Sequence, residues 1–275
     1  MSLLFNNAAS FNQDLSSWKV SQVTMMISMF RGATMFNQPL LKWNVSEVTN
    51  MMGMFNLAKA FNQDLSSWNV ARVRQMDSMF WGATMFNQPL SSWDVSQVTT
   101  MDAMFRDAIN FNQPISSWDV SRVATMVGMF WNAKLFNQDL SSWKVGLVTR
   151  MASMFRDAIT FNQPLISWDV SKVADMSHMF YNAKLFNQDL SSWEVRQVTA
   201  MTEMFKGASS FAQTLCGASW RLKDPKIVEG SKGSIGNADC TTTTIGALYE
   251  PFADRLKTCV TWLGCMHRFA WYREL

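Results

Sequence analysis

Apolar and polar residues alternate along this chain in a pattern that returns every 25 residues. In the copy at residues 86–110, Leu90, Trp93 and Val95 alternate with polar residues. Alternation with a period of two predicts a short, half-buried β-strand. We therefore expect one short strand in the first half of each repeat.

A second apolar stripe follows in the same copy. Its members are spaced at i, i+3, i+6, i+7 and i+10, and they are Val98, Met101, Met104, Phe105 and Ala108. This spacing is typical of one face of an α-helix. Each repeat is thus predicted to contain a loop, a strand and a short helix, in that order.

Strand and helix at a fixed period predict a right-handed β/α solenoid that is leucine-rich-repeat-like. Its short parallel strands would lie on one face and its short helices on the other. We expect residues 1–215 to form this solenoid, with a half repeat at 1–10, eight full repeats at 11–210 and a decayed repeat start at 211–215. Residues 216–275 are expected to form a C-terminal cap or tail. The half repeat is either a ragged cap or the cut end of a longer chain, and we expect the second.

Two residue columns are expected to be structural. The asparagine that follows the first phenylalanine of each repeat, such as Asn87, is expected to form a ladder that satisfies buried turn backbone. The tryptophan of each repeat, from Trp18 to Trp193, is expected to lie in the core. At the fourth position proline and aspartate replace each other, which favours a turn.

Composition and charge exclude some classes of partner. The chain has 22 Met, 20 Phe and 13 Trp, as expected when one short pattern is copied, and its net charge is only +3. Such a balance does not provide the basic patch that binds nucleic acid. No apolar run reaches the length needed to cross a bilayer, so no membrane span is expected.

The stretch FNQPLSSWDVSQVTTMDAMFRDA, residues 86–108, resembles the repeat of BspA-like bacterial surface proteins. The same repeat is found in Mycoplasma surface lipoproteins as a domain of unknown function. The resemblance covers residues 1 to about 215 and implies a leucine-rich-repeat-like solenoid at a cell surface. It implies adhesion or protein binding as the role and provides no catalytic residues.

One candidate binding surface is the position after the helical phenylalanine, which should face solvent. It carries Arg31, Trp81, Arg106, Trp131, Arg156, Tyr181 and Lys206. Aromatic and cationic side chains on adjacent turns either stack as cation–π pairs or form a binding stripe. A duplicated unit of 50 residues also generates this alternation, since WNAKLFNQDLSSW recurs as YNAKLFNQDLSSW.

A second candidate is the outward strand face. It carries Lys19, Asn44, Asn69, Asp94, Asp119, Lys144, Asp169 and Glu194. This polar face is either a binding groove of the solenoid or simply a solvated surface.

The sequence contains no motif for catalysis, for a cofactor or for a metal. We therefore expect a non-enzymatic protein that binds a protein ligand at a cell surface or in a secreted form. The alternatives are a carbohydrate- or matrix-binding adhesin that uses exposed aromatic residues, and a purely structural spacer. The sequence leaves the oligomeric state undefined.

All four cysteines lie after the repeats, at Cys216, Cys240, Cys259 and Cys265. We expect a Cys216–Cys240 disulfide that ties the tail to the last turn, with Cys259–Cys265 as a second bridge. Four cysteines permit three pairings, and the sequence does not choose among them. Disulfides would indicate an oxidising compartment.

Overall fold

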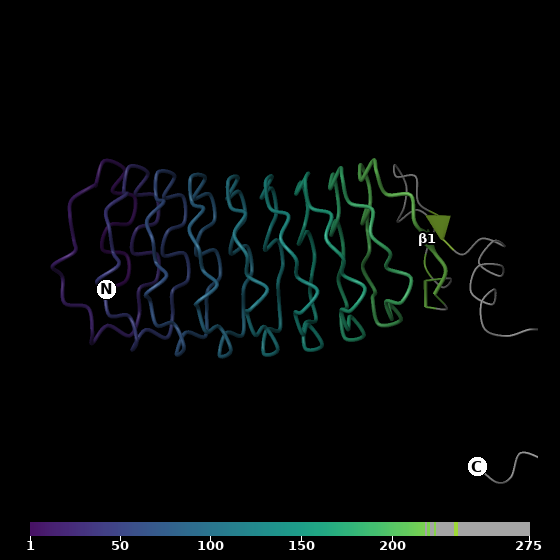
Figure 1. Ribbon diagram of the computed structural model, residues 1–275, viewed down its shortest axis with the longest axis horizontal. Coiled ribbons are helices and arrows are strands. Elements are labelled where there is room, and N and C mark those ends of the chain that lie inside the picture. The colour runs from purple at the N-terminus through teal and green to yellow at the C-terminus, as the bar shows by residue number, and fades with distance from the viewer. Residues whose placement is uncertain (218, 221–222, 224–233, 236–275) are drawn as a thin grey trace, which may run out of the picture. The chain divides into compact units, whose positions relative to one another are not determined.

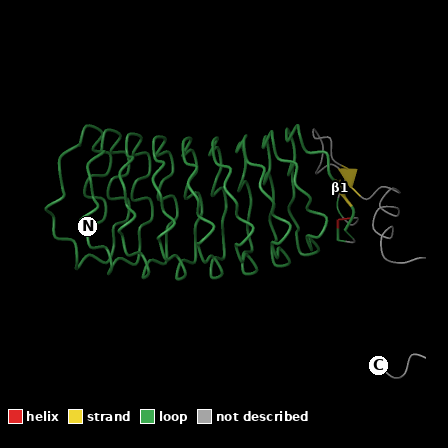
Figure 2. Ribbon diagram, in the orientation of Figure 1, coloured by secondary structure: helices red, strands yellow, loops and turns green. Residues whose placement is uncertain are grey.

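The repeats form a stack of coils, one coil for each 25 residues. The computed structural model describes residues 1–217, 219–220, 223 and 234–235. Within residues 1–217 the coils lie side by side in chain order (Figure 1). They consist of loops and turns (Figure 2), and the only strands in the described part are β1 (Thr214–Leu215) and β2 (Ser234–Ile235), which pair in parallel.

The prediction of a β/α solenoid is wrong. No helix is present within residues 1–217, and Leu90, Trp93 and Val95 do not belong to a strand. Turns interrupt the expected strand on both sides of the tryptophan, at residues 91–92 and 96–97. The apolar side chains still point inward, because the turns repeat at the same residues in every coil.

Consecutive turns replace the expected helix, and their backbone bonds alternate between two directions. The N–H groups of Ala103 and Asp107 donate to carbonyls of the next coil, at 2.8 and 2.7 Å. The intervening N–H of Arg106 donates within its own coil, to Ala103 O at 3.1 Å. A helix would direct every N–H to a residue four positions earlier in the same segment. Here the N–H groups of Met101, Ala103, Phe105 and Asp107 instead join neighbouring coils.

Left-handed backbone makes this alternation possible. Ala103 and Asp107 have φ of 54° and 56°, and each is the third residue of a hydrogen-bonded turn. A positive φ at this position is typical of a type II turn. Glycine adopts it without steric cost, and Gly128 occupies the place of Ala103 one coil later, with φ of 60°.

A line of isolated parallel bridges also joins the coils. It runs through one residue of each coil, namely Met25, Asn50, Gln75, Thr100, Thr125, Arg150, Asp175 and Ala200. Each coil contributes a single bridge rather than a strand. Neighbouring coils are therefore held together by regular contacts, and these contacts are distributed around the circumference of each coil.

Aromatic columns run through the core. Phe80 and Phe86 lie 4.0 Å apart between ring centroids, and Phe80 also stacks on Phe105 of the next coil at 5.6 Å. Trp68 and Trp93 stack with an interplanar angle of 0°. The indole N–H of each core tryptophan donates to a carbonyl of the preceding coil, as Trp93 does to Leu65 O at 3.0 Å. The core prediction for the tryptophan column is confirmed from Trp43 to Trp193.

The predicted asparagine ladder is confirmed. In each coil the asparagine Oδ1 accepts the backbone N–H of the equivalent residue in the next coil, at 2.8–2.9 Å. The aspartates at the fourth position form the expected turns: Asp64 Oδ1 accepts the N–H of Ser66 at 2.8 Å.

The first coil is less completely covered than the others. Trp18 is 37% exposed, whereas the tryptophans from Trp43 to Trp193 are 1–3% exposed. At the other end the column continues past the last full repeat, since the indole of Trp220 is buried and donates to Leu190 O at 2.9 Å.

Candidate binding surfaces

Five side chains from five successive coils alternate on the outside of the stack, and we call them the aromatic–arginine stripe. They are Trp81, Arg106, Trp131, Arg156 and Tyr181. Arg106 Cζ lies 4.6 Å from the ring centroid of Trp81 and 3.6 Å from that of Trp131. Arg156 Cζ lies 4.7 Å from Trp131 and 4.6 Å from Tyr181. The stripe is thus a continuous series of cation–π contacts.

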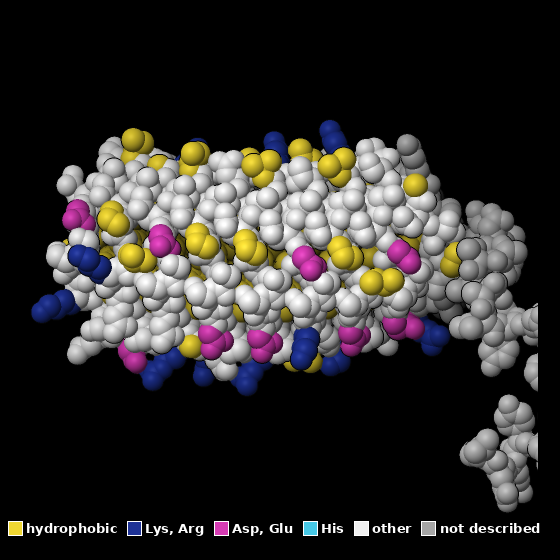
Figure 3. Space-filling model, in the orientation of Figure 1, with side chains coloured by type: hydrophobic (Ala, Val, Ile, Leu, Met, Phe, Trp, Pro, Cys, Tyr) yellow, Lys and Arg dark blue, Asp and Glu magenta, His cyan; other side chains and the backbone are white. Residues whose placement is uncertain are grey.

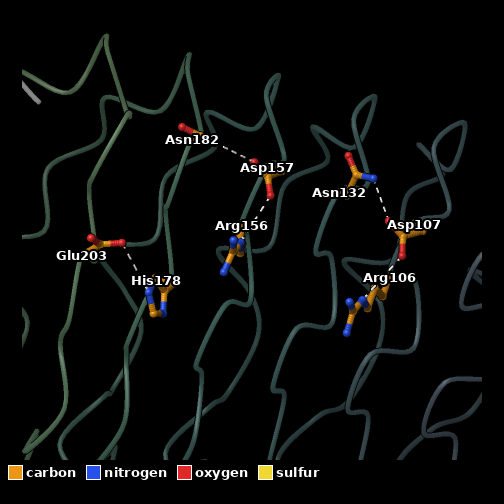
Figure 4. Close-up of polar contacts among 8 residues, drawn as sticks. All are labelled: Arg106, Asp107, Asn132, Arg156, Asp157, His178, Asn182 and Glu203. Carbon is orange, nitrogen blue, oxygen red and sulfur yellow. Dashed lines mark hydrogen bonds and ion pairs between the residues drawn. The ribbon is translucent and has the colours of Figure 1, made fainter. Parts of the chain in front are cut away.

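Each arginine of the stripe forms an ion pair with an aspartate of its own coil. Arg106 Nε lies 3.5 Å from Asp107 Oδ2, and Arg156 Nε lies 3.4 Å from the equivalent atom of Asp157. Asp107 also accepts bonds from the indole N–H of Trp81 at 3.0 Å and from Asn132 Nδ2 at 2.7 Å. Figure 4 shows the same arginine–aspartate–asparagine contacts at both arginines, two coils apart.

A smaller polar cluster follows the stripe. His178 Nε2 lies 3.6 Å from Glu203 Oε2, and the ammonium of Lys206 donates to the other oxygen of Glu203 (Figure 4 shows the His178–Glu203 pair). The bond from Lys206 lowers the pKa of Glu203 below its ordinary value, and the positive charges nearby act in the same direction.

The structure brings together five of the seven residues predicted for the first surface. Arg31 and Lys206 are exposed, and among the described residues no cation–π contact joins Arg31 to the stripe. All seven lie on turns, so the helix face to which they were assigned does not exist. Asp107 and Asp157 were not among the predicted site residues, although their position next to each arginine in the text RDA was a usable signal.

The second predicted surface is a row of turn residues. Lys19, Asn44, Asn69, Asp94, Asp119, Lys144, Asp169 and Glu194 are all exposed, and none lies on a strand. Six of them accept the backbone N–H two residues ahead, as Asp119 does from Ser121 at 3.0 Å. Their polar side chains therefore have a structural role in the turn.

The same turns perturb the titration of two carboxyl groups. Hydrogen bonds from the hydroxyl and N–H of Ser121 lower the pKa of Asp119 below 3.8. The bonds from Ser171 do the same for Asp169. These shifts are explained by local hydrogen bonding, and they require no ligand.

One carboxyl group shifts in the opposite direction. Burial raises the pKa of Asp102, and the neighbouring Asp77 adds to the effect. Asp102 Oδ1 accepts bonds from the Thr125 hydroxyl and the Val127 N–H, both at 2.7 Å, which partly oppose it. The two aspartates lie at the same place in adjacent coils.

An open hollow of about 620 Å³ lies along the bridge line of the first coils. It is lined by Met25, Thr49, Asn50, Arg74, Gln75 and Thr99. The Asn50 and Gln75 side chains bond to each other across it. This hollow was not predicted from the sequence, although Arg74 interrupts a column of threonines at its position.

Part of the predicted disulfide scheme lies outside the described residues. Cys216 directly follows β1, but Cys240, Cys259 and Cys265 are not among the residues that the structure describes. Both pairings therefore stay predictions. In the described part of the chain, no helix has the length and hydrophobicity that a bilayer crossing requires.

Stacked coils with identical inward columns define a tandem-repeat protein. The chain belongs to the family described as Mycoplasma protein of unknown function, DUF285, whose model matches residues 1–84, 65–146 and 108–220. Neither the curated proteins nor the solved structures include a match to this chain.

Proposed function

We propose that this chain is a non-enzymatic binding protein that uses the aromatic–arginine stripe to bind a partner protein. We further propose that it acts at a cell surface or in a secreted form. The resemblance to BspA-like surface repeats supports adhesion as the role of this binding. The observation that carries the proposal is the position of Trp131 between Arg106 and Arg156 on the outside of the stack.

The composition and rigidity of the stripe favour a protein partner. Trp, Tyr and Arg are the residues most enriched at the energetic centres of protein interfaces. The guanidinium groups are fixed by the rings and by Asp107 and Asp157, so little side-chain freedom remains to be lost on binding. All five side chains are half-buried, which leaves part of each available for contact.

The same geometry makes the carbohydrate alternative less favourable. A sugar commonly packs on the free face of an aromatic ring. Trp131 has one guanidinium from the preceding coil and one from the following coil, so neither face of its ring is free. Trp81 and Tyr181 each have one arginine over the ring.

The test is a triple variant with Trp81→Ser, Trp131→Ser and Tyr181→Ser. Its matched control replaces three exposed apolar residues elsewhere on the coils, with Leu41→Ser, Leu147→Ser and Ile166→Ser. Both variants and the wild type would be screened against purified extracellular proteins and against a glycan array. We expect a protein ligand that binds wild type and control alike and binds the triple variant at least about tenfold more weakly.

Two results would contradict the proposal. Loss of glycan binding in the triple variant alone would support the carbohydrate-binding alternative. Absence of any ligand in both panels would support a structural spacer.

The proposed location has its own test. Thiols of the folded protein would be counted with and without reductant, and any bridge would be mapped by mass spectrometry. We expect a Cys216–Cys240 disulfide, because such bridges persist in oxidising compartments. Four free thiols would argue against a secreted or surface location.

A further inference from the structure

A second surface lies at the last two positions of each repeat, directly before the phenylalanine that opens the next. We call it the apolar–lysine edge. In every second coil its final position carries a large apolar side chain that is about half exposed: Met35 (59%), Met85 (52%), Leu135 (48%) and Leu185 (52%). The core does not require these side chains, since the coils between them have Ala60, Asn110 and Thr160 at the same place.

The charge of this edge has one sign. Lys59, Lys134 and Lys184 occupy the first of the two positions, directly before Ala60, Leu135 and Leu185, and all three are exposed. None of them forms an ion pair within the described residues. From residues 9–10 to 209–210, neither position of the edge carries an acidic residue in any coil. Figure 3 shows hydrophobic and basic side chains along the upper rim of the stack, with the acidic ones in lower rows.

The backbone N–H groups of the four exposed apolar residues are already satisfied. The N–H of Met85 donates to Lys59 O at 3.2 Å, and that of Leu135 donates to Ile109 O at the same distance. The hydroxyl of Thr84 donates to Lys59 O at 3.3 Å. Contact with hydrocarbon would therefore not leave these donors unpaired, which is the main cost of placing irregular backbone near lipid.

These bonds also hold the exposed side chains in one line along the stack. Equivalent bonds join Met35 to Ala9 and Leu185 to Ile159, so the edge keeps its register from the first coil to the eighth. In Figure 3 hydrophobic side chains lie spaced along the upper rim of the stack. Such a row offers a folded protein little contact area, whereas a fluid bilayer closes around it.

We propose that the apolar–lysine edge is a peripheral membrane contact that lies along an anionic lipid bilayer. Met35, Met85, Leu135 and Leu185 would enter the boundary between headgroups and acyl chains. Lys59, Lys134 and Lys184 would bind the negatively charged headgroups. This contact needs no spanning segment and uses a surface separate from the aromatic–arginine stripe.

Vesicle co-sedimentation of the full chain tests the proposal. The probes are vesicles of phosphatidylcholine alone and of phosphatidylcholine mixed with phosphatidylglycerol. We expect the wild type to bind the mixed vesicles and to bind them less as salt rises. A variant with Met35→Ser, Met85→Ser, Leu135→Ser and Leu185→Ser, and a second with Lys59→Gln, Lys134→Gln and Lys184→Gln, should each bind at least about tenfold more weakly.

Two controls separate this edge from the other surfaces. The variant with Leu41→Ser, Leu147→Ser and Ile166→Ser loses exposed apolar residues away from the edge, so it should bind vesicles like the wild type. The triple variant of the stripe should also keep vesicle binding, which distinguishes this proposal from the proposed protein binding. Circular dichroism would confirm that each variant is folded.

The proposal is overturned if the wild type binds neither vesicle, or if it binds both equally. It is also overturned if the control variant loses binding as much as the edge variants do. If the edge variants instead lose a protein ligand while no vesicle binds, the edge is a protein interface and the lipid proposal is wrong.

Discussion

The side-chain oxygen of Asn87 accepts the backbone N–H of Asn112 at 2.9 Å and the side-chain amide of Gln113 at 3.1 Å. One short side chain thus satisfies two donors of the next coil. The relationship repeats through the stack, so it connects the coils at a turn where no strand pairing exists.

Replacing Asn87 by alanine should destabilise the array by about 1–3 kcal/mol, because the N–H of Asn112 would lose its partner. Urea unfolding followed by tryptophan fluorescence measures the change. Asn110→Ala is the control, since the side chain of Asn110 makes only a 3.7 Å contact to Met85 Sδ. An equal loss for both variants would show that the ladder has no special role.

The tryptophan column predicts a dependence on position. Trp93→Ala should cost about 3–5 kcal/mol, because it removes a buried ring and the bond to Leu65 O. Trp18→Ala should cost less, since Trp18 is 37% exposed. Thermal unfolding of the two variants checks the order, and a larger cost at Trp18 would contradict the burial argument.

Two arginines at the same repeat position should contribute unequally to the free energy of unfolding, because only one of them belongs to the stripe. Arg106→Ala removes two cation–π contacts, each of which contributes about 0.5–1 kcal/mol, so a loss of about 1–2 kcal/mol is expected. Arg31→Ala should have almost no effect, because Arg31 is exposed and outside the stripe. Denaturant midpoints give the comparison, and equal midpoints would argue against the contacts as a source of stability.

The lowered pKa of Asp119 predicts a loss of stability in acid. Its folded pKa lies below the ordinary 3.8, so its contribution is present above that pH and is lost as pH falls through the folded pKa. The difference in unfolding free energy between wild type and Asp119→Ala should therefore shrink below pH 3.8. Asn69→Ala, at the same place in another coil, should give a difference that does not vary with pH, because Asn69 accepts the Ala71 N–H without titrating.

Asp102 predicts the opposite dependence. Its pKa is raised, so the folded state favours the protonated form, and that stability is lost as pH rises through the folded pKa. Asp102→Asn keeps the oxygen that accepts the Thr125 and Val127 bonds and removes the charge. The variant should gain stability relative to wild type above the folded pKa, and a pH series of unfolding curves would show whether the gain disappears towards pH 3.8.

The sequence was sufficient to predict the register of the stack but not its backbone. A strict period of 25 residues requires equivalent residues to lie over one another, so the columns of Trp93 and Asn87 followed directly. The spacing of Met101, Met104 and Phe105 fits a helix, yet it fits successive turns equally well. Donors such as the N–H of Ala103 bond to the next coil, and spacing within one repeat does not report such a bond.

A local signal for these turns was nevertheless present. The positions of Ala103 and Asp107 carry Gly, Ser, Asn or Asp in many other coils, including Gly53, Gly128 and Asn132, and such residues tolerate a positive φ. For the stripe, the sequence indicated the stacked pairs. The text RDA places Asp107 and Asp157 next to the arginines, but the contact of each aspartate with its arginine also depends on the left-handed turn in which the aspartate lies.

Because the repeat period is fixed, the distance between two residues along the stack is set by the number of coils that separate them. Trp81 and Trp131 are two coils apart, as are Arg106 and Arg156, and so are Leu135 and Leu185. A duplication of 50 residues therefore lengthens the stripe and the edge together and keeps their relative phase. An array that grows in this way gains valency at constant spacing, so its avidity for a repetitive or extended partner can rise without a change in any single contact.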